Sequence, residues 1–245
     1  MKPITLAVLV AFAATPLLGQ IVLTTEAGDG ADAYIFDRFP TTNYGLDTTA
    51  AVKNDNVNYR RKAYFRFDLS GLTGTASSAS LTFHDFADGI GNNLNLYMLN
   101  QGNAGENWGE TTITWSNAPA NITSSPSGLS AGEVTFLSSL TTDGFNRWAE
   151  LTYSPSVTTV FTGLESAINT ALSDTGDNYL TFIVTASSSN TSYAWSAFTK
   201  EHNSLAAPYL SINGITAVPE PATYAAIAFG VLGLAIFNRR RKRST

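Results

Sequence analysis

The sequence predicts an all-β protein, an antiparallel jelly-roll β-sandwich that contains one short helix. Three observations support this class. Apolar and polar residues alternate in short stretches along the chain, turn residues separate these stretches, and only 13% of the residues are charged. Many short strands spaced about 8–15 residues apart are typical of sandwiches and jelly rolls.

The first 19 residues have the layout of a secretory signal peptide. Lys2 precedes an apolar stretch at residues 4–14, and Pro16 and Gly19 follow it. A basic start, an apolar centre and small residues at the end are the three parts of such a signal. We therefore expect an exported protein with one folded domain at residues 20–217.

The clearest strand signal is "KAYFRFDLSG" at residues 62–71. Its apolar face comprises Ala63, Phe65, Phe67 and Leu69, and its other face comprises Tyr64, Arg66 and Asp68. This alternation predicts a strand with one side on a core. Comparable stretches predict strands at residues 49–53, 80–85, 93–99, 113–115, 133–137, 179–185, 193–198 and 209–212.

One segment departs from the alternation of the predicted strands. "TGLESAINTALSDTG", residues 162–176, places Leu164, Ile168 and Leu172 four residues apart. This spacing predicts a short helix with one apolar stripe, which Gly176 terminates. We expect the helix to pack across one end or edge of the sandwich.

Composition excludes several kinds of function. The chain has no cysteine, which excludes disulfides, thiolate metal sites and a cysteine nucleophile. Residues 20–218 contain eight Lys and Arg against eighteen Asp and Glu. An acidic body argues against nucleic acid as a partner, because phosphate binding requires a concentrated positive surface.

The C-terminal residues 218–245 predict a membrane segment. Residues 222–237 carry no charge and would span about 24 Å as a helix, slightly less than the ~30 Å hydrocarbon layer. The alternative is a core helix, but five basic residues follow the segment: Arg239, Arg240, Arg241, Lys242 and Arg243. Such a cluster stays on the cytoplasmic side, so we predict a transmembrane helix with the body outside the membrane.

The same tail resembles a known sorting signal. Pro219, Glu220 and Pro221, the apolar segment and the basic end are similar to the PEP-CTERM signal of Gram-negative bacteria. The resemblance implies processing by an exosortase-type membrane enzyme, in organisms that often make exopolysaccharide and biofilm. It implies passage through the periplasm, transient anchoring in the inner membrane, and delivery to the cell surface or extracellular matrix.

The body resembles a second family. "DAYIFDRFPTTNYGLDTTAAVKND", "RRKAYFRFDLSGL", "ENWGETTITWSNAP" and "AFTKEHNSLAAPYLSI" are similar to the DNRLRE-domain family, from Asp32 to Ile212. The resemblance implies a jelly-roll β-sandwich that acts as an adhesive or binding module. Some members of that family are classed as carbohydrate-binding modules, with alginate among their reported ligand types.

The strongest local candidate for binding is "KNDNVNYRRKAY", residues 53–64. It contains four of the body's eight cations beside a tyrosine, so the predicted contact residues are Lys53, Tyr59, Arg60, Arg61 and Lys62. Arginine suits carboxylates and tyrosine offers a face to a sugar ring, which favours an acidic glycan. The alternative is that these charges only solvate a strand edge.

Tryptophans offer a second kind of glycan platform. Trp108, in the polar stretch "GNAGENWGE", is predicted to be exposed and is a further candidate contact. Trp115 lies in "TITW", which is predicted to be a strand, and is expected to face the core.

The sequence gives little support for catalysis or for a cofactor. His84 and His202 lie in no recognisable nucleophile or zinc motif. Five acidic residues lie near the start of the body: Asp29, Asp32, Asp37, Asp47 and Asp55. They lack EF-hand spacing, so the sequence predicts no metal site and leaves a structural calcium ion as an open alternative.

These observations favour an exported, non-catalytic binding protein. The expected partner is an exopolysaccharide or cell-surface glycan, with an acidic one favoured. The competing hypothesis is a structural surface or biofilm matrix protein that binds no sugar. A polysaccharide-degrading enzyme is the least favoured alternative.

Overall fold

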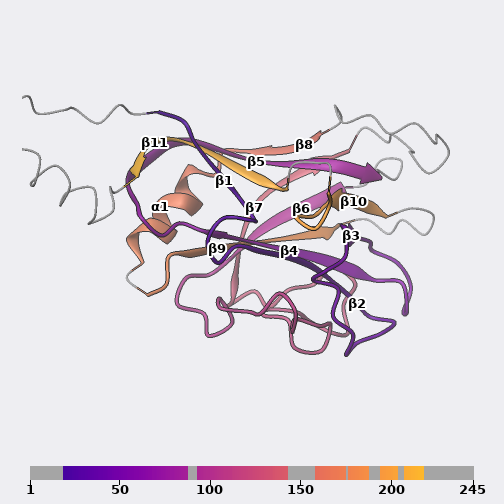
Figure 1. Ribbon diagram of the computed structural model, residues 1–245. Coiled ribbons are helices and arrows are strands. Elements are labelled where there is room, and N and C mark those ends of the chain that lie inside the picture. Colours follow the sequence, from indigo (N-terminus) through magenta and orange to yellow (C-terminus); the bar gives the residue numbers. More distant parts are fainter. Residues whose placement is uncertain are drawn as a thin grey trace, which may run out of the picture.

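The computed structural model describes residues 19–87, 93–142, 158–174, 176–187, 194–203 and 207–217. Within these ranges the chain forms eleven strands and one helix (Figure 1). The elements are β1 (Ile21–Thr24), β2 (Ala31–Phe36), β3 (Thr49–Val52), β4 (Arg61–Asp68), β5 (Leu72–Ala87), β6 (Asn93–Leu99), β7 (Val134–Thr141), β8 (Thr158–Thr162), α1 (Glu165–Ser173), β9 (Tyr179–Ala186), β10 (Trp195–Phe198) and β11 (Tyr209–Ala217).

The strands form two sheets that pack face to face. The first sheet has the order β1-β11-β5-β10-β3, with β8 also paired to β5, and the second has the order β2-β4-β9-β6-β7. Every pairing is antiparallel, and the chain crosses repeatedly from one sheet to the other. The predicted antiparallel jelly-roll sandwich is therefore confirmed.

The main core lies between the sheets and is rich in aromatic rings. Phe65 of β4 contacts Phe83 of β5 at 4.7 Å between ring centroids, and Phe83 meets Trp195 edge-on at 5.3 Å. The Trp195 indole Nε1 donates to Asp85 Oδ1 and Thr159 Oγ1, each at 3.2 Å. The predicted apolar face of β4 is fully buried in this core.

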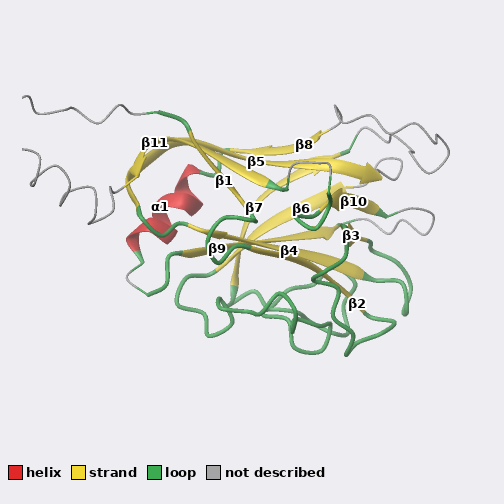
Figure 2. Ribbon diagram, in the orientation of Figure 1, coloured by secondary structure: helices red, strands yellow, loops and turns green. Residues whose placement is uncertain are grey.

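The opposite face of β4 is also buried, which the alternation did not predict. Residues 100–133, between β6 and β7, fold over the outer side of the second sheet, where Figure 2 shows loops instead of solvent-facing strand. Tyr64 and Ile183 form a second apolar cluster there with Trp108, Ile113 and Trp115. The molecule therefore has a third layer made of turns.

The predicted helix is confirmed as α1. Ala167, Ile168 and Ala171 are buried, and the Asn169 side chain accepts from Ala76 N at 2.7 Å and donates to Ala76 O at 3.1 Å. The helix thus closes one end of the sandwich beside β5 (Figure 1).

Helix α1 ends before the predicted glycine. Asp174 follows its last residue in an extended conformation, and Gly176 has no positive φ. The prediction that Gly176 terminates the helix is therefore wrong.

Three strands were not predicted, and one predicted strand is absent. β1, β2 and β8 had no clear alternation in the sequence, and β2 is buried on both faces. Residues 113–115 form no strand and lead into a turn, in which Ala118 N donates to Thr114 O at 3.0 Å. Trp115 is buried as predicted, but in the turn layer and not in a strand.

The two predicted targeting segments, residues 1–19 and 218–245, lie almost wholly outside the described residues. Among the residues that are described, no helix is long and apolar enough to cross a bilayer.

The termini of the described chain lie at one end of the sandwich. Ala217, the last residue of β11, pairs with Leu72 at the start of β5, close to the end of β4. β1 runs antiparallel to β11, so the chain before Ile21 leaves toward the same end (Figure 1). The loop between β3 and β4 lies at the opposite end.

A latch holds the β2–β3 connection against the turn layer. The Asn43 side-chain amide donates to Glu110 O and Ile113 O, both at 2.7 Å, and Gly45 N donates to Asn43 Oδ1 at 3.1 Å. A Cβ at Gly45 would lie 2.0 Å from Glu110 O. Only glycine allows this close approach of the two backbones.

We expect Gly45→Ala to lower the free energy of unfolding by about 1–3 kcal/mol, because the backbones would have to separate. The matched control is Gly132→Ala in the same turn layer, where a Cβ meets nothing within 4 Å; its effect should stay within about 0.5 kcal/mol. Urea unfolding of both variants measures the difference. Equal stability of the two variants would contradict the claim that the close approach at position 45 requires glycine.

Candidate functional site

A row of aromatic rings lines the open edge between the two sheets. Tyr34 and Phe36 lie on the inward-facing side of the edge strand β2, and Tyr44 and Phe39 come from the connection that follows it. Tyr34 stacks on Tyr44 with ring centroids 4.6 Å apart, and Phe36 meets Phe39 edge-on at 5.8 Å. These four residues, together with Arg61, are called the rim cluster.

Arg61 is the cation of the rim cluster. Its guanidinium carbon lies 4.0 Å from the centre of the Phe36 ring, in line with the pairing of Phe36 and Arg61 across β2 and β4. Within the described residues, no hydrogen bond or ion pair of this guanidinium is present. Burial lowers the Arg61 pKa, but an arginine stays charged.

The cations of the neighbouring loop are neutralised by contacts within the protein. Lys53 pairs with Asp55 at 2.7 Å, and its ammonium lies 5.6 Å from the Tyr59 ring centre. Arg60 Nη1 donates to Ser124 O at 3.0 Å, and its Nε lies 3.7 Å from an Asp37 oxygen. The structure brings these residues next to the rim cluster, where Tyr59 is 47% exposed.

Lys62 does not lie on this surface. It points to the outer face of β4, is fully buried, and its ammonium donates to Gly128 O at 2.6 Å and Asn121 Oδ1 at 2.7 Å. The ammonium also lies 5.0 Å from the Trp115 ring centre. Lys62 therefore holds the turn layer, and its prediction as a surface contact is corrected because successive side chains of a strand point to opposite faces.

Trp108 is buried, so the prediction that it is exposed is wrong. It is 6% exposed, meets Tyr64 edge-on at 6.0 Å, and its Nε1 donates to Thr181 Oγ1 at 3.1 Å. Arg66 lies against its ring at 5.3 Å. The surrounding glycines and asparagines make turns of a packed layer and not a solvent-exposed loop.

The aromatic part of the rim cluster was not predicted from the sequence. Tyr34, Phe36, Phe39 and Tyr44 all lie within "DAYIFDRFPTTNYG", a stretch with an unusual density of aromatic residues. That density was the available signal. What the sequence could not show is that β2 is an edge strand of the second sheet, which places these rings at the edge of the sandwich.

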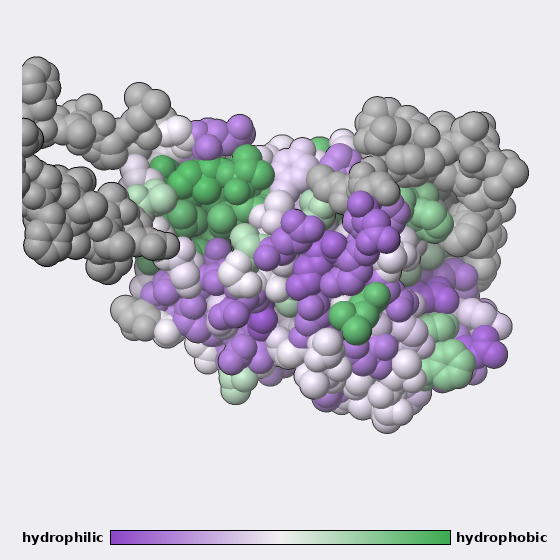
Figure 3. All heavy atoms as spheres, viewed as in Figure 1, coloured by the Kyte–Doolittle hydropathy of each residue, from purple (hydrophilic) through white to green (hydrophobic). Residues whose placement is uncertain are grey.

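The rim cluster differs chemically from the surface around β1 and β11. Figure 3 shows an apolar area around β1 and β11, where Val22 is 53% exposed. Aliphatic side chains there offer neither a ring face nor a charge for a hydrophilic ligand. The rim cluster offers both.

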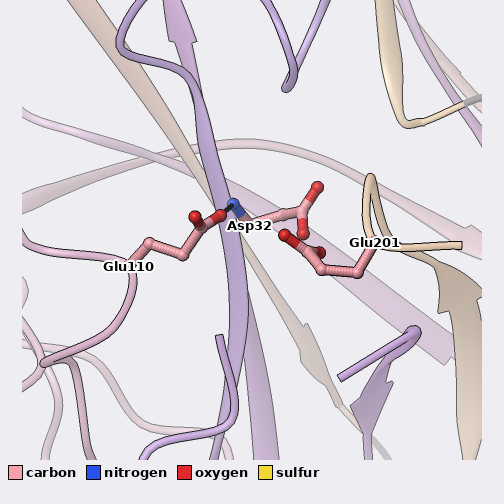
Figure 4. Close-up of side chains that lie close together, drawn as sticks. All are labelled: Asp32, Glu110 and Glu201. Atoms are coloured by element: carbon pink, nitrogen blue, oxygen red, sulfur yellow. Dashed lines mark hydrogen bonds between the residues drawn. The ribbon is translucent and has the colours of Figure 1, made fainter. Parts of the chain in front are cut away.

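Two groups of carboxylates have a spacing that is compatible with metal binding. Asp32, Glu110 and Glu201 place one oxygen each within 4.8 Å of one another (Figure 4), and so do Glu106, Asp174 and Asp177. Burial raises the pKa of the Asp32 carboxyl to about 8 and that of Glu106 to about 7.

Comparison with known proteins gives two family matches. A family model described as carbohydrate-binding module family 96 matches residues 24–214. A model described as the PEP-CTERM protein-sorting motif matches residues 217–242. No curated protein sequence matches the chain. The predicted resemblances to a carbohydrate-binding module and to a PEP-CTERM signal are thereby confirmed.

The burial of Lys62 has a consequence for the pH dependence of stability. Burial, together with the positive charge of Arg60, lowers the pKa of the Lys62 ammonium to about 7. The unfolded chain keeps that proton up to about pH 10.4. Between these two values the unfolded state binds more protons than the folded state, so the free energy of unfolding rises with pH.

We expect the free energy of unfolding of the wild type, minus that of Lys62→Met, to rise from pH 7 to pH 10. The slope should approach about 1.4 kcal/mol per pH unit. Subtracting the variant removes the titration of all other groups. A flat difference across this range would show that Lys62 stays charged in the folded protein.

Proposed function

The chain belongs to carbohydrate-binding module family 96, and on this premise we propose that it binds an acidic polysaccharide through its rim cluster. The observation that carries the proposal is Arg61, a guanidinium stacked 4.0 Å from Phe36 with no ionic partner in the described residues. A uronate residue offers the two groups that such a site needs, a carboxylate for Arg61 and a ring face for an aromatic side chain.

The acidic side chains around the rim are engaged by donors of the protein. Asp37 accepts from Asn58 N and Arg60 N, each at 2.9 Å. Asp55 pairs with Lys53, and Asp47 accepts from the Tyr34 hydroxyl at 3.1 Å. This engagement offsets the repulsion that the acidic body would exert on a polyanion. It leaves Arg61 available to a ligand, together with the exposed Arg38, whose guanidinium carbon lies 5.4 Å from the centre of the Phe39 ring.

The sorting motif indicates an exported protein that is sorted to the cell surface in Gram-negative bacteria. We propose that an exosortase-type enzyme acts at Pro219, Glu220 and Pro221, while the basic cluster from Arg239 to Arg243 holds the chain in the inner membrane. Release would then deliver the domain to the cell surface or matrix. A carbohydrate-binding module is a non-catalytic domain, so the function proposed is retention and not cleavage.

We expect Arg61→Gln to weaken binding to an immobilised uronate polymer about tenfold, because one charge-assisted contact is lost. Arg61→Lys should give an intermediate loss, since lysine keeps the charge without the planar fork. Affinity electrophoresis in a uronate polymer, with a neutral glucan as comparison, measures both effects in the full-length chain kept in mild detergent.

A pair of exposed phenylalanines tests the position of the site. Phe39 of the rim is 47% exposed, and Phe136 of β7, at the opposite edge of the same sheet, is 54% exposed. Phe39→Ala should weaken binding about three- to tenfold and Phe136→Ala should not. Equal losses would place the site elsewhere. If the wild type is retained by no polysaccharide, the structural matrix role is favoured instead.

A further inference from the structure

Three carboxylates from distant parts of the chain meet behind the rim cluster. Asp32 comes from β2, Glu110 from the turn layer, and Glu201 from the turn after β10 (Figure 4). They therefore join an edge strand of the second sheet, the third layer, and a connection of the first sheet.

Asp32 is the most constrained of the three. It is fully buried, and its Oδ2 accepts from the Thr25 hydroxyl at 2.5 Å and from Lys200 N at 3.1 Å. Its Oδ1 and Glu201 Oε2 are buried without a hydrogen-bond partner among the described residues. Leaving a buried carboxylate oxygen unpaired is costly, so such atoms require an explanation.

The Asp32 and Glu201 carboxyl groups point toward one another (Figure 4). Two carboxylates only accept hydrogen bonds, so they repel unless a proton or a cation lies between them. A single shared proton would satisfy this pair but would leave Glu110 outside the arrangement.

The charge count of the cluster favours a divalent cation. Lys200 Nζ lies 2.9 Å from Glu110 Oε2, and it also donates to Gly30 O at 3.2 Å. A bound cation would displace the proton that burial favours on Asp32. The three carboxylates, then ionised, and this one ammonium leave a net charge of about −2, which one divalent ion neutralises. Glu110 Oε1 accepts from Asp32 N at 2.8 Å, so this N–H and the ammonium together fix the orientation of the Glu110 carboxylate.

We propose that Asp32, Glu110 and Glu201 bind a calcium ion that ties the three layers together. The donor set is made only of oxygens, which suits hard cations, and calcium accepts irregular geometry with bonds of about 2.3–2.6 Å. Oxygens up to 4.8 Å apart can share one such ion. Asp32 lies two residues before Tyr34 on the same side of β2, so the ion would also fix the strand that carries the rim cluster.

The experiment compares the full-length chain in mild detergent with calcium, with magnesium and with a chelator. We expect calcium to raise the melting temperature by about 5 °C or more over the chelator, and calorimetric titration to show one calcium per chain. Magnesium should have a smaller effect, because it dehydrates reluctantly and needs near-octahedral ligands.

Two isosteric variants locate the ion. Glu201→Gln should abolish both the stabilisation and the calorimetric signal, and Asp32→Asn is a second variant for the same test should the first not fold. Glu106→Gln is the matched control, since Glu106 is a buried glutamate in the second acidic group. The proposal is overturned if calcium has no effect on the wild type, if Glu201→Gln binds calcium normally, or if Glu106→Gln loses binding.

Discussion

Two basic side chains that β4 buries on its outer face hold the turn layer in place. Arg66 Nη1 donates to Trp108 O at 2.7 Å, its Nε donates to Asp29 O at 2.9 Å, and its guanidinium lies 4.7 Å from the Tyr179 ring centre. Lys62, four residues earlier in β4, likewise donates to the turn layer, with its ammonium 2.6 Å from Gly128 O. Buried charges are tolerated only when they are paired or hydrogen-bonded. Separating the turn layer from β4 would therefore deprive Lys62 and Arg66 of their acceptors in that layer.

That constraint extends from the turn layer to the open edge. Because the layer is fixed, the backbone at Glu110 is in place to accept from Asn43, and the connection bearing Tyr44 closes against Phe36 and Tyr34. Glu110 in turn accepts from the backbone N–H of Asp32 at 2.8 Å. The edge that we propose as the ligand site is thus positioned by contacts on the opposite face of the same sheet.

The sequence was sufficient to predict the fold because a sandwich needs alternation on one face of each strand. The apolar face of β4 and the stripe of α1 were both predicted correctly for this reason. The burial of the outer face of β4 was not predicted. A polar residue such as Arg66 takes the same alternating position whether it contacts water or a folded segment. β2 escaped prediction since burial on both faces removes the period of two.

The candidate site was predictable only where its members are neighbours in the chain. Tyr59, Arg60 and Arg61 are consecutive, and their grouping was visible, although Arg60 pairs with Asp37 and, of the two arginines, Arg61 alone has no ionic partner in the part of the chain described. Asp32 was noted among early acidic residues, but Glu110 and Glu201 follow it by 78 and 169 positions. These three residues are brought together by the order of the strands in the sheets, and no local pattern in the sequence reveals it.

The placement of the chain ends has a mechanical consequence. The sorting segment follows Ala217 at one end of the sandwich, and β5, which pairs with β11, runs about 50 Å from there to the end that bears the rim. A domain tethered by its tail while gripping a polymer at the rim would be pulled along its strands. Hydrogen bonds in an antiparallel pair are perpendicular to the strands, so such tension loads them in shear, all together, rather than unzipping them one by one.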